Sequence, residues 1–180
     1  MRCSRLILAA LLLGGPAAAQ EPANRDLGIG VPATPAMIAP WNIDVRGDGK
    51  GLPPGHGSVA EGEALYATAC ASCHGKDGVH GALSPALRLA GGIGTLASAK
   101  PERTVGSYWP YAPTLFDYIR RAMPFTAPQS LTDDQVYAVA GYVLFLNGLV
   151  PHDAVLDARS LAAVKMPNRD GFRPVPPADR

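Results

Sequence analysis

The sequence has few cysteines, no excess of charge of one sign and no long apolar run beyond its first 20 residues. It holds three cysteines in 180 residues, and 16 Lys and Arg stand against 15 Asp and Glu. A charge this close to balance, with no basic stripe, argues against a nucleic-acid-binding protein. A membrane-spanning helix needs about 20 apolar residues, so we expect no membrane span in the mature chain.

The first 19 residues are typical of a secretory signal peptide. Arg2 and Arg5 give a basic start, Leu6 to Leu13 form a short apolar run, and alanines 17–19 offer a small-residue cleavage site. We expect cleavage after Ala19 and export to the periplasm; a retained N-terminal anchor is the alternative. Cleavage would leave 14 of the 16 basic residues against 15 acidic ones.

The remaining chain has the length of a single domain. Its 20 glycines and 18 prolines predict many turns and modest secondary structure. We interpret residues 20–57 as an extended N-terminal arm over the surface, with Trp41 as its anchor. Residues 58–150 form the predicted folded domain, and residues 151–180 a C-terminal tail similar to the arm.

Export would also remove Cys3, which leaves Cys70 and Cys73 in the stretch "ACASCHG". A zinc site needs four protein ligands, or three and an open position, and with His74 this tight stretch offers at most three. A thioredoxin-like pair would stand in a βαβ unit, and no such alternation is visible. CxxCH is the spacing at which two thiols attach one porphyrin while the histidine ligates its iron. The sequence therefore predicts one covalent haem c.

The opposite face of the iron needs a second ligand, and several residues compete for it. Met123 precedes Pro124, which restricts Met123 away from the helical region and leaves its thioether on an extended segment. Met166 also precedes a proline and is the main rival, although we interpret it as surface packing after the last helix. The other candidates are Met37 in the arm, His80, which is close to His74, and His56 and His152, which we place in loops. A site without a second protein ligand is the last alternative.

A thioether opposite an imidazole raises the reduction potential of a haem iron and fills its coordination sphere. We therefore expect a protein that moves one electron at a time without bond chemistry at the iron. A haem enzyme or a gas sensor with an open sixth site is the alternative from another class.

Three helices are readable in the sequence. The first spans about 59–70, the second begins after Thr114 as N-cap, and the third follows Thr132. Thr132 and Gln135 have the spacing of a capping box, and Gly148 suits the left-handed position that ends a helix.

Two glycines lie inside predicted helices, Gly62 in the first and Gly141 in the third. A glycine inside a helix costs about 1 kcal/mol relative to alanine. A close crossing of two helix backbones would offset that cost, and tolerated drift is the alternative.

CxxCH, a downstream "MP" and a closing amphipathic helix resemble class I c-type cytochromes. The stretch "GSYWPYAPTLFDYIRRAMPFTAPQSLTDDQVYAVAGYVLFLNG" (106–148) is more specific. It is similar to the SoxD-type cytochrome subunit of bacterial sulfur and sulfite dehydrogenases, as are "WNIDVRGDGKGLPPGHGSVAEGEALYATACASCHG" and "VKMPNRDGF". The resemblance covers about residues 30–172 and implies an all-α class I cytochrome c fold, with three main helices around one haem.

The resemblance also implies roles for single residues. Cys70 and Cys73 match the thioether cysteines, His74 matches the proximal ligand and Met123 the distal one. Pro85 falls where this class has a proline whose carbonyl accepts the N–H of the proximal imidazole, with an ordinary turn proline as the alternative.

Residues near Met123 are candidates for contact with a haem or with a partner. Trp109 or Tyr108 is a candidate hydrogen-bond donor to a haem propionate, and core packing is the alternative. Arg120 or Arg121 is a candidate for pairing with a propionate or with an acidic partner surface. Phe125 is a candidate for packing beside the haem or at a docking rim.

The family implies two partners, a molybdopterin subunit related to sulfite oxidase that supplies electrons, and another cytochrome c that takes them. We therefore expect an electron-transfer subunit of a sulfur or sulfite dehydrogenase that is not catalytic alone. The best-known SoxD-type subunits carry two haem domains and this chain has one CxxCH motif, so a single-haem sulfite dehydrogenase subunit is equally compatible. A free soluble electron carrier is the alternative.

Overall fold

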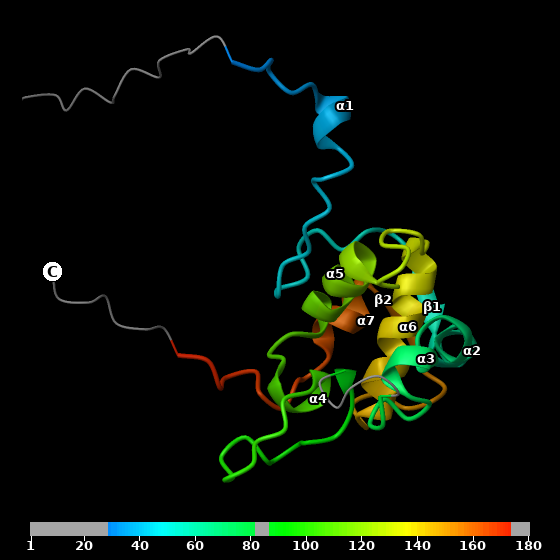
Figure 1. Cartoon of the computed structure of the whole chain (residues 1–180), viewed down its shortest axis with the longest axis vertical. Coiled ribbons are helices and arrows are strands. Elements are labelled where there is room, and N and C mark those ends of the chain that lie inside the picture. Colours follow the sequence, from blue (N-terminus) through cyan, green and yellow to red (C-terminus); the bar gives the residue numbers. More distant parts are fainter. Residues whose placement is uncertain (1–28, 82–86, 174–180) are drawn as a thin grey trace, which may run out of the picture. The chain divides into compact units, whose positions relative to one another are not determined.

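The structure is a computed structural model that describes residues 29–81 and 87–173 (Figure 1). The chain divides into two compact units, residues 1–34 and 35–180. The helices and strands of the described residues all lie in the second unit. In chain order they are α1 (Pro35–Ile38), β1 (His56–Ser58), α2 (Val59–Ala69), α3 (Ala71–His74), α4 (Val105–Tyr108), α5 (Ala112–Ala122), α6 (Asp133–Leu146), β2 (Val155–Asp157) and α7 (Ala158–Ala163).

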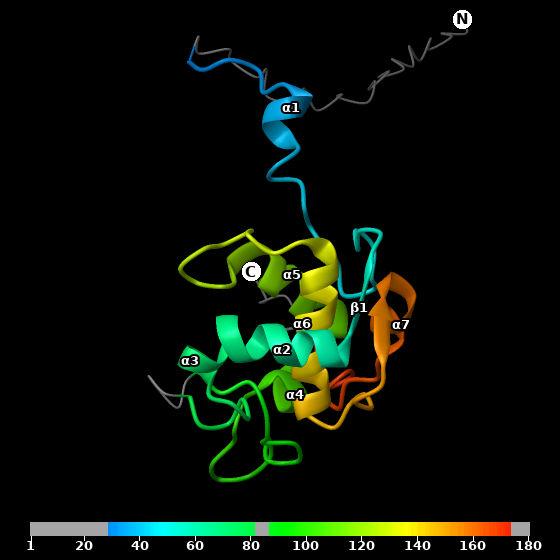
Figure 2. The ribbon, with the colours of Figure 1, turned by 90° about the vertical axis from the view of Figure 1, so that its right-hand side faces the viewer.

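The centre of the fold is the crossing of α2 and α6 (Figure 2). A Cβ added to Gly62 would overlap the backbone carbonyl of Ala138, so the two helix backbones touch there. The predicted close crossing at Gly62 is confirmed. Gly141 differs, because an added Cβ would meet only the side chains of Leu156 and Val59, at 3.2 and 3.4 Å.

Both ends of α6 follow the sequence prediction. The Thr132 hydroxyl accepts from the backbone N–H of Gln135, whose side chain accepts from the N–H of Thr132, so the capping box is confirmed. Gly148 has φ +68°, and its N–H donates to the Phe145 carbonyl while the next N–H donates to the Leu144 carbonyl. These two bonds form a Schellman motif.

The predicted start of the second helix is wrong by one short turn. α5 begins at Ala112 with Tyr111 as N-cap, and Pro113 occupies its first turn. The hydroxyl of Thr114 donates to the Tyr111 carbonyl at 2.6 Å. A proline is tolerated in the first turn because its missing N–H would have no helical partner there, and this places Thr114 inside the helix.

Residues 151–166 are packed on the domain, so the expectation of an extended tail is wrong for this part. β2 pairs antiparallel with β1, with Gly57 opposite Leu156. The side chains of Leu156, Leu161 and Met166 are all buried. Strands of three residues carry too little alternation for a sequence pattern to reveal them.

The arm is anchored by other residues than the sequence suggests. Trp41 is 75% exposed, so its predicted role as anchor is wrong. Val45 is buried instead, and its N–H donates to the Asp117 carboxylate at 3.0 Å. Arg121 donates to both Asp117 and Asp44, at 3.0 and 2.8 Å. Among the described helices, none is long and apolar enough to cross a membrane.

Candidate functional site

The CxxCH motif forms one helical turn at the end of α2. Cys70 ends α2 and precedes α3, and its carbonyl accepts from the N–H groups of Cys73 and His74 at 3.1 and 3.0 Å. Both cysteines are half-buried free thiols. Burial, with a smaller effect of the neighbouring Cys73, raises the pKa of the Cys70 thiol to about 11. The two strands of the described chain pair antiparallel, so no βαβ unit holds this pair, which argues against a thioredoxin-like dithiol.

The imidazole of His74 is held in the tautomer that an iron ligand needs. Its Nδ1 lies 2.6 Å from the carbonyl oxygen of Leu87. Because a carbonyl only accepts, the proton sits on Nδ1, and the lone pair of Nε2 is free to ligate a metal. Pro85, whose carbonyl the resemblance assigned to this role, lies outside the described residues, so its role stays a prediction.

Tyr66 fixes the backbone that follows His74. Its ring is buried and lies 5.1 Å from the ring of Tyr142, centroid to centroid. Its hydroxyl donates to the carbonyl of Gly75 at 2.9 Å. Burial, more than neighbouring charges, raises the pKa of Tyr66, so the hydroxyl stays a donor. The sequence carries no signal for this hydrogen bond.

Met123 lies where the sequence predicted, just beyond a helix end. It caps α5 in an extended conformation (φ −123°, ψ 148°), and its N–H donates to the Ile119 carbonyl at 3.0 Å. Its side chain is half-buried against the apolar core. Met166, its main rival, is only 3% exposed and belongs to the core. The interpretation of Met166 as surface packing is therefore wrong.

The other histidines each have contacts of their own. His80 Nδ1 lies 2.7 Å from Asp77, and His152 Nε2 lies 2.9 Å from Glu63. Because such a contact leaves the second ring nitrogen free, it does not decide between these histidines and Met123. His56 is exposed and opens β1, so its predicted place in a loop is wrong. Met37 is 55% exposed in α1.

Trp109 and Arg120 have protein contacts of their own. Trp109 is half-buried and packs its ring edge to face on Tyr118, with 5.8 Å between the ring centroids. The Nε of Arg120 lies 3.1 Å from the Asp133 carboxylate. Their predicted contacts with a haem propionate stay predictions. Phe125 is 82% exposed.

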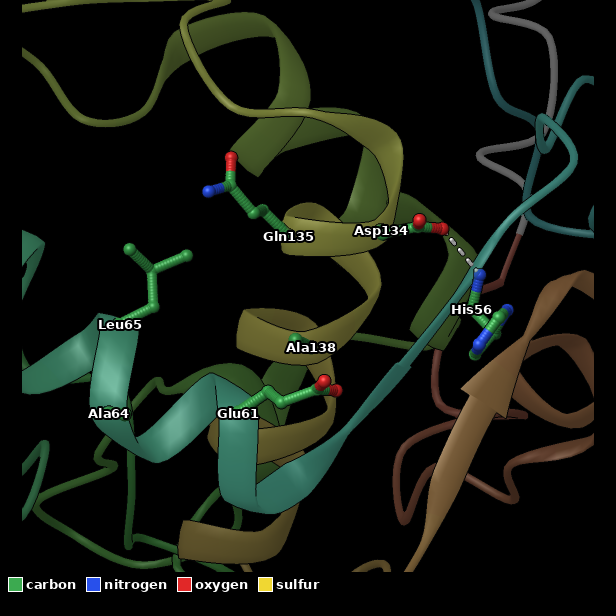
Figure 3. Close-up of a pocket in the computed structure, with 7 residues that line it drawn as sticks. All are labelled: His56, Glu61, Ala64, Leu65, Asp134, Gln135 and Ala138. Carbon is green, nitrogen blue, oxygen red and sulfur yellow. Dashed lines mark hydrogen bonds between the residues drawn. The ribbon is translucent and has the colours of Figure 1, made fainter.

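A cavity of about 460 Å³ between α2 and α6 is lined by one candidate ligand, His56, and by neither CxxCH nor Met123 (Figure 3). Glu61 bonds to Ser58 in the cap of α2, and the dashed line in Figure 3 joins the His56 N–H to Asp134. Because its polar groups serve caps and strand ends, this cavity is not the functional site. Its lining residues are His56, Glu61, Ala64, Leu65, Asp134, Gln135 and Ala138.

The donors near CxxCH fit a haem better than a bare metal ion. In the described part of the chain, no group of three or more His, Cys, Asp or Glu could hold a metal ion. CxxCH offers two free thiols one turn apart and an imidazole with a free Nε2, and Met123 offers a thioether on an extended segment at the end of α5. Thioether addition and axial ligation of a haem require this set.

Two comparisons with known proteins agree with this chemistry. Residues 57–143 match the family described as cytochrome c oxidase, cbb3-type, subunit III. A chain in the crystal structure of the sulfane dehydrogenase SoxCD from Paracoccus pantotrophus is 45% identical, with a TM-score of 0.76. The match covers 83% of this chain and 73% of that one. The chain belongs to the c-type cytochromes. Among curated protein sequences, none gives a significant match to this cytochrome.

The cytochrome family implies a haem c, and the identity to a SoxCD chain confirms the resemblance drawn from the sequence. The predicted class I fold is also confirmed: the described chain is mostly helical, with one small two-stranded sheet.

Proposed function

We propose that this cytochrome is a periplasmic monohaem carrier that receives electrons one at a time from a molybdenum-containing sulfur or sulfite dehydrogenase subunit. It passes them to another cytochrome c. The observation that carries the proposal is the CxxCH turn with the proton of His74 held on Nδ1, in a chain related to SoxCD. The predicted signal peptide supports the periplasmic location, although it lies outside the described residues.

The residues that would hold the haem are Cys70 and Cys73 through thioether bonds, with His74 and Met123 as axial ligands. A haem held in this way supplies reversible one-electron transfer and leaves no open position for oxygen or peroxide. Leu87 keeps the His74 proton on Nδ1.

The N-terminal arm supports a stable protein partner. Met37, Ile38 and Trp41, all in the second unit, are 55%, 48% and 75% exposed. The sequence contains no charged residue from 27 to 43. Exposed apolar side chains in succession mark protein interfaces in soluble proteins. We place the dehydrogenase subunit on this arm.

Purification of the complex from the native periplasm tests the proposal. Sulfite or thiosulfate should reduce the haem in the complex but not in the isolated cytochrome, because the sulfur oxidation takes place on the partner. A cytochrome that purifies alone as a monomer, with no molybdopterin protein attached, would contradict the proposed partner.

A further inference from the structure

The strongest unassigned feature is the side-chain amide of Asn147, just past the end of α6. Asn147 is one of few buried polar residues among those described, at 8% exposure. Its backbone caps the C-terminal end of α6, and its side chain bonds to neighbouring backbone groups. The amide nitrogen donates to the carbonyls of Leu89 and Val143, at 3.1 and 2.9 Å, and the amide oxygen accepts from the N–H of Gly91 at 3.2 Å.

These bonds join α6 to the loop that holds His74. Leu89 is two residues after Leu87, whose carbonyl accepts from His74 Nδ1 at 2.6 Å. The Asn147 amide donates to the loop at the Leu89 carbonyl and accepts from it at the Gly91 N–H. Fixing Leu89 in this way restricts where the Leu87 carbonyl can lie.

Neighbouring elements enclose the same amide. A Cβ added to Gly106 in α4 would overlap the Asn147 amide, so no larger residue fits against it. The Thr104 hydroxyl donates to the Gly91 carbonyl at 2.6 Å, and the Val105 N–H donates to the Leu89 carbonyl at 3.2 Å. The loop is therefore clamped between the start of α4 and the end of α6.

We propose that Asn147 is a positioning residue for the axial ligand His74: its amide holds the Leu89–Gly91 backbone, and through it the carbonyl that orients the imidazole. This rests on the haem ligation proposed above. A hydrogen bond from Nδ1–H makes the imidazole a stronger donor to the iron, which favours oxidised iron. Loosening the loop should therefore shift the equilibrium toward reduced iron.

The test is Asn147→Asp in the haem-loaded protein, because a carboxylate of the same shape cannot donate to Leu89 or Val143. We expect the His74 Nδ1–H proton of the reduced protein to exchange with solvent roughly tenfold faster, equivalent to one lost hydrogen bond. The redox readout uses Asn147→Ala, which introduces no charge, because the carboxylate of the Asp variant would itself favour oxidised iron. In Asn147→Ala the ratio of reduced to oxidised haem at a fixed applied potential should rise severalfold, and proton exchange should be faster as well.

The matched control is Tyr137→Phe, which removes a side-chain donation to the Pro53 carbonyl, a 2.7 Å bond near the start of α6. It should leave proton exchange and haem reduction unchanged. Asn147 variants that carry haem and lose only stability would overturn the inference and leave the proposed function intact. Wild-type protein without attached haem would overturn the proposed function itself.

Discussion

At the scale of single residues, the account depends most on Met123. Met123→Ala removes the proposed thioether ligand, so the reduced protein should bind carbon monoxide rapidly. Its reduction potential should fall, because a thioether favours reduced iron. Carbon monoxide difference spectra and a redox titration measure the two effects.

Met166→Leu is the control for Met123→Ala. Met166 is buried in the core, and a swap that nearly conserves volume costs less than about 1.5 kcal/mol. This variant should lower only the free energy of unfolding. If Met166→Leu changed the potential and Met123→Ala did not, the assignment of the sixth ligand would be wrong.

Asp77 should make the loop after CxxCH sensitive to acid. Its carboxylate accepts from the N–H groups of His80 and Val79, and these bonds hold the pKa of Asp77 well below its ordinary value. A lowered folded pKa contributes stability that is present above the unfolded pKa of about 3.9 and is lost as pH falls toward the folded pKa. Asp77→Ala should therefore be less stable at pH 7, and its stability should fall less steeply than that of the wild type below about pH 4. Parallel slopes in urea unfolding across this range would contradict the role given to the carboxylate.

The sequence predicted the local backbone of the candidate site better than its packing. CxxCH and the proline after Met123 are local signals. In the structure CxxCH follows the first predicted helix, and Met123 has an extended backbone, as these signals indicate. The burial of Met166 and the exposure of Trp41 depend on which distant segments pack against them. A single sequence does not contain that information in its local pattern.

At the scale of helices and strands, the crossing of α2 and α6 makes a specific prediction. Gly62→Ala should destabilise the fold by about 1–3 kcal/mol, because the new methyl group would overlap the Ala138 carbonyl. This exceeds the gain of about 1 kcal/mol in helix propensity. Gly141→Ala is the matched control and should cost much less, since its methyl group would meet only side chains. Equal losses in urea unfolding would mean that the backbones do not touch at Gly62.

The length of each element decided whether it could be predicted. α6 has 14 residues, a capping box and a terminal glycine, so several independent signals agree on its limits. β1, β2 and α4 have three or four residues each, too few for a periodic pattern. The clamp formed by Asn147 was also invisible, because its partners at Leu89 and Gly91 are more than 50 residues away in sequence.

At the scale of the whole molecule, the proposed arm contact predicts that Trp41 contributes to complex formation. The base of the arm is fixed at Val45 by Asp117, so changes at Trp41 should leave the domain intact. Trp41→Ser should weaken binding to the dehydrogenase subunit by about 2 kcal/mol, or roughly thirtyfold, the typical loss at an interface tryptophan. Reduction potential and unfolding should be unchanged. Unchanged affinity in a binding titration would place the interface elsewhere.

The central claim is that this polypeptide carries a covalently attached haem and therefore relays electrons. Mass spectrometry of the protein purified from the periplasm tests it most directly. The account predicts one tetrapyrrole on the peptide that contains Cys70 and Cys73. An unmodified peptide with two free thiols would contradict it.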